Sequence, residues 1–98
     1  MKIAIISINN PSLASATKLL NILKDDDCTI YNKSQEGKQF VKFDKLDDIL
    51  PIAWVEYEAI ICIMATGAVV RKIAPYLQNK ATDPAVLVMT LDLQRVIP

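Results

Sequence analysis

"EAIICIMATGAVVRKIAPYL", residues 58–77, joins an apolar run to a helix-like segment with almost no linker between them. The run before Met64 is β-branched and lacks polar alternation, which is typical of a strand buried on both faces of a parallel sheet. Thr66 and Gly67 then mark a tight turn, and the pattern after them predicts a helix. Because proline lacks the helical N–H group, we expect this helix to break at Ala74-Pro75, with residues 75–79 as a separate short turn.

Other apolar runs predict three further strands, at residues 2–8, 28–32 and 84–90. Residues 33–43 are polar and then partly alternating, which predicts a loop or an irregular edge. The last segment, residues 91–98, predicts a turn followed by a strand that is cut off just as it starts.

Two more helices are expected between these strands. In residues 9–27 Asn10 is placed to cap the helix and Pro11 fits its first position, while the acidic residues at the end belong to a turn. In residues 44–57 Asp44 is the expected N-cap, and Pro51 predicts a kinked or split helix.

Strands that alternate with helices predict an α/β fold of three layers, with helices on both faces of a mostly parallel, Rossmann or flavodoxin-like sheet. We expect the strand order 2-1-3-4. This order reverses the winding between the first and third strands, where such folds form their ligand crevice. The loops "SINNPS" (7–12) and "MATG" (64–67) flank that position.

Composition limits the class of protein. With 98 residues, 52% of them hydrophobic, the chain is expected to form a single domain over residues 1–98. Its 11 basic and 11 acidic residues cancel without a basic cluster, which argues against a nucleic-acid partner. The apolar run at the N-terminus is too short for a signal peptide or a membrane span, so we expect a cytoplasmic protein with no membrane contact.

The chain has two cysteines and no histidine. Cys28 and Cys62 each lie in an apolar segment, which predicts buried free thiols rather than a disulfide or a metal site. Without histidine, a Ser-His or Cys-His nucleophile pair is excluded within these residues.

The Thr-Gly turn has the composition of an anion site. A helix N-terminus exposes backbone N–H groups, and the absence of a Cβ at Gly67 lets a ligand approach them. Arg71 lies about one turn further on and leans back toward the same point. Neutral donors could come from the first helix across the crevice. The candidate binding residues are therefore Thr66, Gly67, Ala68, Arg71, Asn9, Asn10 and Ser12.

A simpler interpretation stays open, in which Thr66 only caps a helix, Gly67 only forms a tight turn and Arg71 is only a solvated side chain. The first strand is not followed by the glycine pattern of dinucleotide-binding folds, and no "GK[ST]" sequence occurs. We therefore expect no nucleotide cofactor.

The segments "MKIAIISI", "EAIICIMATGAVVRKIAPYL", "KATDPAVLVM" and "RVIP" resemble the N-terminal domain of the CbiG proteins of anaerobic cobalamin biosynthesis. The resemblance covers both ends and most of the second half of the chain. It implies a cobalt-precorrin 5A hydrolase, which opens a δ-lactone on the macrocycle and releases acetaldehyde. The implied substrate is a cobalt-bearing tetrapyrrole fringed with carboxylates, so cobalt enters with the substrate and no resident metal or cofactor is expected.

Members of that family continue after "RVI" into a glycine-rich segment with Ser-Gly-His and a C-terminal domain. The resemblance thus implies that residues 1–98 are the N-terminal part of a longer protein, partnered by that domain and inactive alone. A final strand cut short would also leave an exposed sheet edge, which could support a homodimer.

Lactone opening needs an activated water and an oxyanion stabiliser. The N-terminus of the third helix with Arg71 could be the stabiliser. Asp92 is the candidate general base, although an ordinary turn aspartate explains it as well. Two other classes of function remain open: a noncatalytic interaction module of the same pathway, and a flavodoxin-like domain that binds FMN or a phosphorylated ligand.

Overall fold

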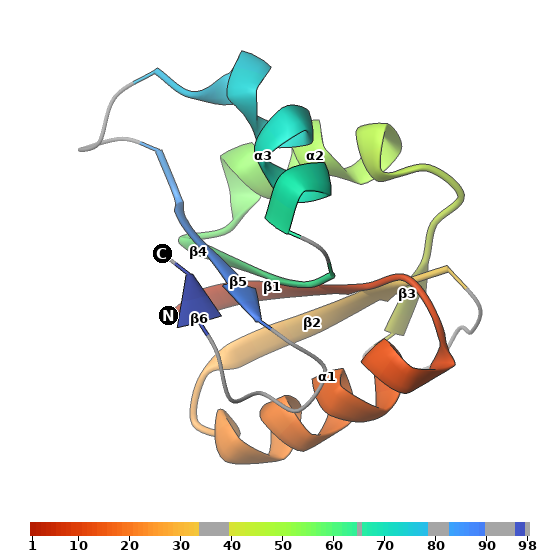
Figure 1. Cartoon of the computed structure of the whole chain (residues 1–98). Coiled ribbons are helices and arrows are strands. Elements are labelled where there is room, and N and C mark those ends of the chain that lie inside the picture. The colour runs from red at the N-terminus through yellow and green to blue at the C-terminus, as the bar shows by residue number, and fades with distance from the viewer. Residues whose placement is uncertain (34–39, 65, 79–82, 90–95, 98) are drawn as a thin grey trace.

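A mostly parallel sheet runs through the middle of the chain and is covered by helices on both faces (Figure 1). The computed structural model describes residues 1–33, 40–64, 66–78, 83–89 and 96–97. In chain order the elements are β1 (Lys2–Ser7), α1 (Asn10–Ile22), β2 (Asp27–Asn32), β3 (Phe40–Lys42), α2 (Leu46–Glu56), β4 (Ala59–Ile63), α3 (Thr66–Ile73), the 3₁₀ helix η1 (Ala74–Tyr76), β5 (Ala85–Met89) and β6 (Val96–Ile97).

The inner strands pair in the order β2-β1-β4-β5, which is the order predicted for the four long strands. These neighbours are all parallel. The sheet also has short edge strands whose pairing the sequence did not predict. Strand β3 lies parallel to β2, and β6 lies antiparallel to β5. The predicted order is therefore matched only in part, because very short edge strands carry little pattern of their own.

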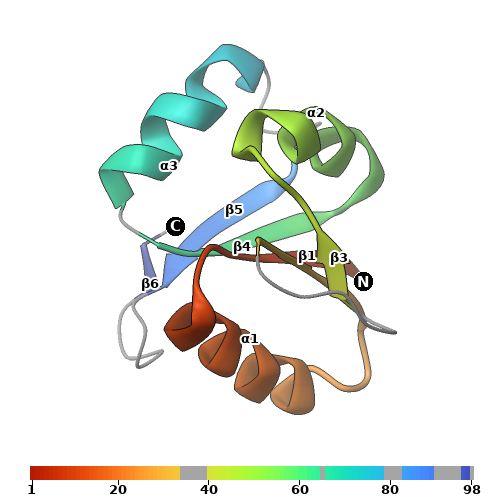
Figure 2. The same cartoon turned by 90° about the vertical axis from the view of Figure 1, so that its right-hand side faces the viewer.

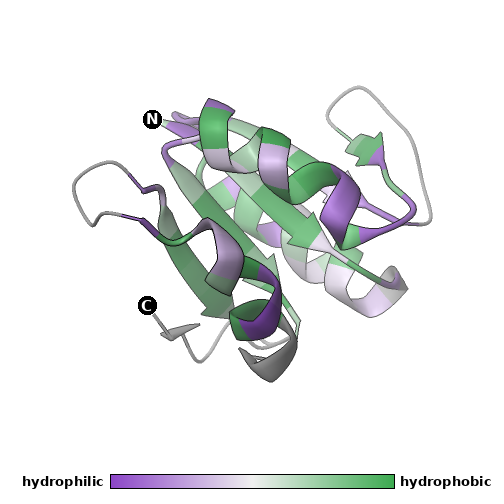
Figure 3. Ribbon diagram, turned by 90° about the horizontal axis from the view of Figure 1, so that it is seen from above, coloured by the Kyte–Doolittle hydropathy of each residue, from purple (hydrophilic) through white to green (hydrophobic). Residues whose placement is uncertain are grey.

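Side chains of β1 alternate between two separate hydrophobic clusters, one on each face of the sheet. Ile3 and Ile5 pack with the residues of α1, while Ala4 and Ile6 pack with those of α2 and with Val69 of α3. Figure 2 shows α1 below the sheet and α2 with α3 above it, and the strands in Figure 3 are mostly green, the colour of hydrophobic residues. Burial on both faces explains why the sequence of β1 lacks polar alternation.

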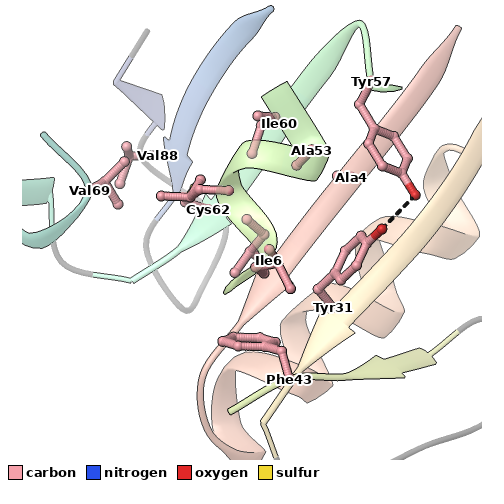
Figure 4. Close-up of a cluster of buried hydrophobic side chains, with 12 residues drawn as sticks. Ala4, Ile6, Tyr31, Phe43, Ala53, Tyr57, Ile60, Cys62, Val69 and Val88 are labelled. Atoms are coloured by element: carbon pink, nitrogen blue, oxygen red, sulfur yellow. Dashed lines mark hydrogen bonds between the residues drawn. The ribbon is translucent and has the colours of Figure 1, made fainter. Parts of the chain in front are cut away.

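Two tyrosine hydroxyls satisfy each other inside the cluster on the α2 side (Figure 4). The hydroxyl oxygens of Tyr31 and Tyr57 lie 3.0 Å apart, and their rings meet edge to face with centroids 6.0 Å apart. The Lys2 ammonium lies 5.0 Å from the ring centroid of Tyr57. A buried hydroxyl without a partner would be costly, so this bond lets two polar atoms remain within an apolar layer.

The helix starts differ from the predictions by one residue. Asn9, not Asn10, is the N-cap of α1, since its side-chain Oδ1 accepts the N–H of Ser12 at 2.9 Å. Asp44 is not the N-cap of α2, because that position is held by Lys45. The Lys45 N–H donates instead to the carboxylate of Asp48 at 3.3 Å, so the acidic side chain follows the cap rather than preceding it.

The two prolines act differently. Helix α2 continues through Pro51 and is not split. Pro51 is exposed, so the carbonyl oxygen of residue 47 that loses its helical N–H partner can bind water instead. The predicted break before Pro75 is confirmed, since α3 ends at Ile73 and η1 follows. None of the helices in the described part of the chain has both the length and the apolar character needed to cross a membrane.

Two residues of α2, one buried and one exposed, test how much the packing of this helix contributes to stability. Leu50 is 1% exposed and Ile52 is 49% exposed. Leu50→Ala should lower the free energy of unfolding by about 2–5 kcal/mol, because it leaves a cavity under α2. The matched control Ile52→Ala should lower it by under about 1 kcal/mol. Urea unfolding of both variants measures this, and equal losses would contradict the burial described.

Candidate carboxylate-binding edge

The pairing of β1 with β4 places two helix starts at one edge of the sheet. Ser7 pairs with Ile63, so both strands reach this edge together. Helix α1 then begins on one face and α3 on the other (Figure 2). We call this the carboxyl edge, and the opposite one the amino edge. The carboxyl edge thus contains the winding reversal at which α/β folds bind ligands.

Asn9 and Ser12 close the start of α1 through a network of short bonds. The Ser12 hydroxyl oxygen accepts the N–H groups of Ile8 and Asn9, each at 3.0 Å. The same hydroxyl donates to the Asn9 carbonyl at 3.0 Å. Because Ser12 is fully buried and its proton is used, it holds the loop in shape, while exposed Asn9 remains within reach of a ligand. The side chain of Asn10 lies outside the described residues.

A second polar contact fixes the ends of β1 and β2. The Ser7 hydroxyl lies 3.4 Å from the Asn32 side-chain oxygen and 3.4 Å from the Tyr31 carbonyl. Ser7 and Asn32 are fully buried. Neither residue was predicted to have a role, although a polar residue at the end of an apolar strand is the pattern that could have indicated one.

Helix α3 begins at Thr66, one residue earlier than predicted, so Thr66 is its first residue and not its N-cap. Residue 65 and the side chains of residues 66–68 lie outside the described residues. Gly67 and Ala68 follow in the first turn, where backbone N–H groups lack helical partners. Arg71 is exposed and stands four residues after Gly67, on the same face of the helix.

The neighbouring residue Lys72 anchors α3 to α2. Its ammonium lies 3.0 Å from the carboxylate of Asp47, in the first turn of α2. Among the described residues no salt bridge involves Arg71. The guanidinium of Arg71 can therefore bind an external anion without first breaking an ion pair in the described part of the chain.

The candidate general base, Asp92, lies outside the described residues, so its role stays a prediction. At the amino edge, the carboxylate of Asp83 accepts the N–H of Gln78 at 2.8 Å.

Described residues line hollows at opposite edges of the sheet. A hollow of about 410 Å³ is lined by Lys33, Lys42, Phe43 and Asp44, where β2 and β3 end at the carboxyl edge. It was not predicted from the sequence, because residues 33–43 have no clear pattern. A larger hollow of about 490 Å³ lies between the end of α2 and η1, at the amino edge, and includes Trp54 and Tyr76.

Both cysteines are free and buried, as predicted. Burial raises the pKa of the Cys62 thiol to about 12. The pKa of Cys28 is also raised, first by burial and then by the nearby Asp26 and Asp27 carboxylates. Burial, and then the hydrogen bond that Tyr31 shares with Tyr57, likewise raise the pKa of Tyr31. The thiols of Cys28 and Cys62 therefore remain protonated near neutral pH and do not act as nucleophiles. Among the described residues no group of three or more Cys, Asp or Glu side chains could hold a metal ion.

Comparison with known families supplies the identification. The family model described as "Cobalamin synthesis G N-terminal" matches residues 48–98, more than half of the chain. The chain belongs to the CbiG N-terminal family. Its matched residues include β4, α3 and Arg71, whereas Lys33 and Lys42 lie before them. This CbiG family membership links the chain to cobalamin biosynthesis.

Individual CbiG relatives agree. The chain is 32% identical over 91 residues to a cobalt-precorrin-5A hydrolase from Priestia megaterium, with 88% of this chain and 24% of that protein covered. A crystal structure of a cobalamin biosynthesis protein G homolog from Sulfolobus solfataricus has the same fold, with a TM-score of 0.77 and 24% identity. That likeness covers 99% of this chain and 28% of the homolog. The chain therefore spans about a quarter of the length of these relatives.

The buried thiol of Cys62 predicts a loss of stability at high pH. The folded protein holds this proton up to about pH 12, whereas the ordinary thiol pKa is 9.0. Between these values the unfolded chain binds fewer protons, so the free energy of unfolding falls as the pH rises. Cys62→Ala should make that fall less steep. Urea unfolding from pH 8 upward tests this, with Leu50→Ala as a destabilised control that keeps the thiol; identical slopes in the three proteins would contradict it.

Proposed function

We propose that this chain is the N-terminal domain of a cobalt-precorrin 5A hydrolase, and that its carboxyl edge binds peripheral carboxylates of the cobalt-bearing tetrapyrrole. The position of α3 supports this most directly. The N-terminus of α3 lies at the carboxyl edge, where the winding of the sheet reverses, and within the part of the chain that matches the family. A helix N-terminus favours an anion through its free N–H groups and its dipole.

The carboxylate would be held by the backbone N–H groups of Gly67 and Ala68, with Thr66 at the helix start. Arg71 adds a full positive charge and two parallel N–H donors, which match the two oxygens of a carboxylate. From α1, the amide of Asn9 adds a neutral donor, as could Asn10. Ser12 contributes only by holding the loop, since its hydroxyl is already bonded.

Apolar surface is also available beside these donors. Ile8 follows β1 at the carboxyl edge and is 39% exposed, and Val70 precedes Arg71 and is 54% exposed. A macrocycle gains by covering such side chains, because apolar area leaves water when it binds. The edge therefore offers apolar contact for a ring and polar contact for its carboxylates.

The proposed reaction is hydrolysis of the δ-lactone to a carboxylate and an alcohol. The alcohol then loses its proton and its carbon's bond to the macrocycle breaks, which releases acetaldehyde and leaves the electron pair, and then a proton, on the ring. When water attacks a lactone, negative charge develops on the carbonyl oxygen before the acyl C–O bond breaks. The N–H groups at the start of α3 and Arg71 have the charge to stabilise that oxygen, and Asp92 is the candidate general base. We propose that this chemistry requires the C-terminal domain, so that residues 1–98 alone bind the substrate but do not convert it to product. A cytoplasmic location fits the two free cysteines.

A noncatalytic interaction module is the second candidate, because of the hollow at the amino edge. Val55 beside it is 84% exposed, and the rings of Trp54 and Tyr76 lie 5.8 Å apart within it. Exposed apolar and aromatic surface of this kind is common at protein contacts. Full activity of the whole protein after removal of residues 1–98 would favour this candidate over the binding role.

Calorimetric titration with a carboxylate-bearing cobalt corrinoid, cobyrinic acid, tests the binding role. The wild-type chain should bind it saturably, and Arg71→Gln should weaken binding by about tenfold, because a charge-assisted bond is lost. Lys18→Gln, which removes an exposed charge from α1, is the matched control and should change little. The same corrinoid with amidated carboxylates should bind weakly to both.

The outcomes separate the candidates. Equal binding by wild type and Arg71→Gln would remove Arg71 from the site. Binding of FMN instead of the corrinoid would favour a flavodoxin-like function. Calorimetry is preferred to tryptophan fluorescence, because Trp54 lies in the hollow at the amino edge and not at the carboxyl edge.

A further inference from the structure

The charges at the two edges of the sheet are of opposite kinds, although the whole chain is neutral. At the amino edge, the described strand starts and the connections before them carry mostly carboxylates: Asp25, Asp26, Asp27, Glu58 and Asp83, against Lys2, Lys24 and the N-terminal ammonium of Met1, which lies 3.4 Å from Asp26. At the carboxyl edge, the described strand ends and connections carry Lys33, Lys42 and Lys45 against Asp44. An anion that approaches the molecule is therefore drawn toward the carboxyl edge.

Two other acidic residues close to the carboxyl edge, in the first turn of α2, already have partners. Asp47 pairs with Lys72 at 3.0 Å, and Asp48 accepts the N–H of Lys45. Among the described residues no salt bridge involves Lys33 or Lys42. Of the charges that line the hollow between β2 and β3, two are ammonium groups and one is the carboxylate of Asp44.

The backbones that carry the two lysines are held side by side. Lys42 is the register partner of Asn32, the residue before Lys33. The Phe43 N–H donates to the Asn32 carbonyl at 3.0 Å, which continues the pairing beyond the end of β3. Asn32 is in turn fixed to β1 through Ser7. The hollow thus has a rigid backbone floor, over which the flexible lysine side chains can adjust to a bound anion.

We propose that Lys33 and Lys42 form a second anion subsite, which takes another carboxylate of the ligand that binds at α3. This inference rests on the proposed function. Lys33 follows β2 and Lys42 lies in β3, which are two and three strand spacings from β4, so the two subsites are roughly 10–14 Å apart. A small acid cannot bridge that distance, whereas a rigid macrocycle with carboxylates around its rim can. The subsite would select ligands with several well-separated carboxylates and align the ring across the edge.

Calorimetric titration of the chain with cobyrinic acid tests the subsite. Lys33→Gln and Lys42→Gln should each weaken binding by roughly three- to fivefold, and the double variant by about tenfold or more. Lys24→Gln, at the amino edge, is the matched control and should leave the affinity unchanged. Added salt should weaken wild-type binding more steeply than binding by the double variant, because fewer charges remain to be screened. Circular dichroism verifies that each variant is folded.

The outcomes of these titrations distinguish a failure of the second subsite from a failure of the proposed function. If Arg71→Gln weakens binding while the double lysine variant matches wild type, the second subsite is wrong and the proposed function stands. If the wild-type chain does not bind cobyrinic acid, the proposed function fails, and a ¹H–¹⁵N NMR titration with citrate decides the subsite alone. Saturable shifts at the amides of Lys33 and Lys42, abolished in the double variant, would support it, whereas their absence would overturn it.

Discussion

The parallel pairing of β1 with β4 is the constraint on which the rest of the structure depends. It aligns Ser7 with Ile63, so the chain leaves both strands at the same edge, once toward each face of the sheet. Because both strands are buried on both faces, a shift of register by one residue would exchange their side chains between the two cores. The position of the carboxyl edge is therefore determined by packing and not by the loops that form it.

Polar contacts then give that edge its shape. Ser7 joins the end of β1 to Asn32, and Ser12 ties the loop after β1 to the first turn of α1. Both serines are fully buried, so these bonds form away from water, where leaving them unmade would be costly. A ligand at this edge would meet backbone groups already in place, so little ordering would be needed when it binds.

The fold separates charges that cancel in the composition. The chain is neutral as a whole, which argued against a nucleic-acid partner but gave no indication of a polarity between the edges. The lysines of the carboxyl edge are far apart in sequence from Arg71, and only the fold brings them to one side. Such a distribution favours a ligand with several carboxylates over a ligand with one, since separated positive charges can each bind a different carboxylate of a rigid ligand.

The sequence predicted the inner sheet well, because β1, β2, β4 and β5 are long apolar runs whose pattern has a single explanation. It predicted a short last strand within residues 91–98 and a loop or irregular edge over residues 33–43, but not how β3 and β6 pair, since two or three residues carry no period. It placed the cap of α1 at Asn10 because two adjacent asparagines suit that position equally. The proposed anion site at α3 follows from Thr66, Gly67 and Arg71 and stays a prediction. The hollow at Lys33 and Lys42 could not be predicted, because it depends on pairing between β2 and β3.

Mapping of ¹H–¹⁵N chemical shifts with cobyrinic acid would test the central claim most directly, that the carboxyl edge is the binding face. The account predicts shifts that cluster at Ile8 and Asn9, at Lys33 and Lys42, and along α3 from Gly67 to Arg71. Shifts centred instead on Trp54 and Tyr76 would contradict it, because the ligand would then occupy the hollow at the amino edge.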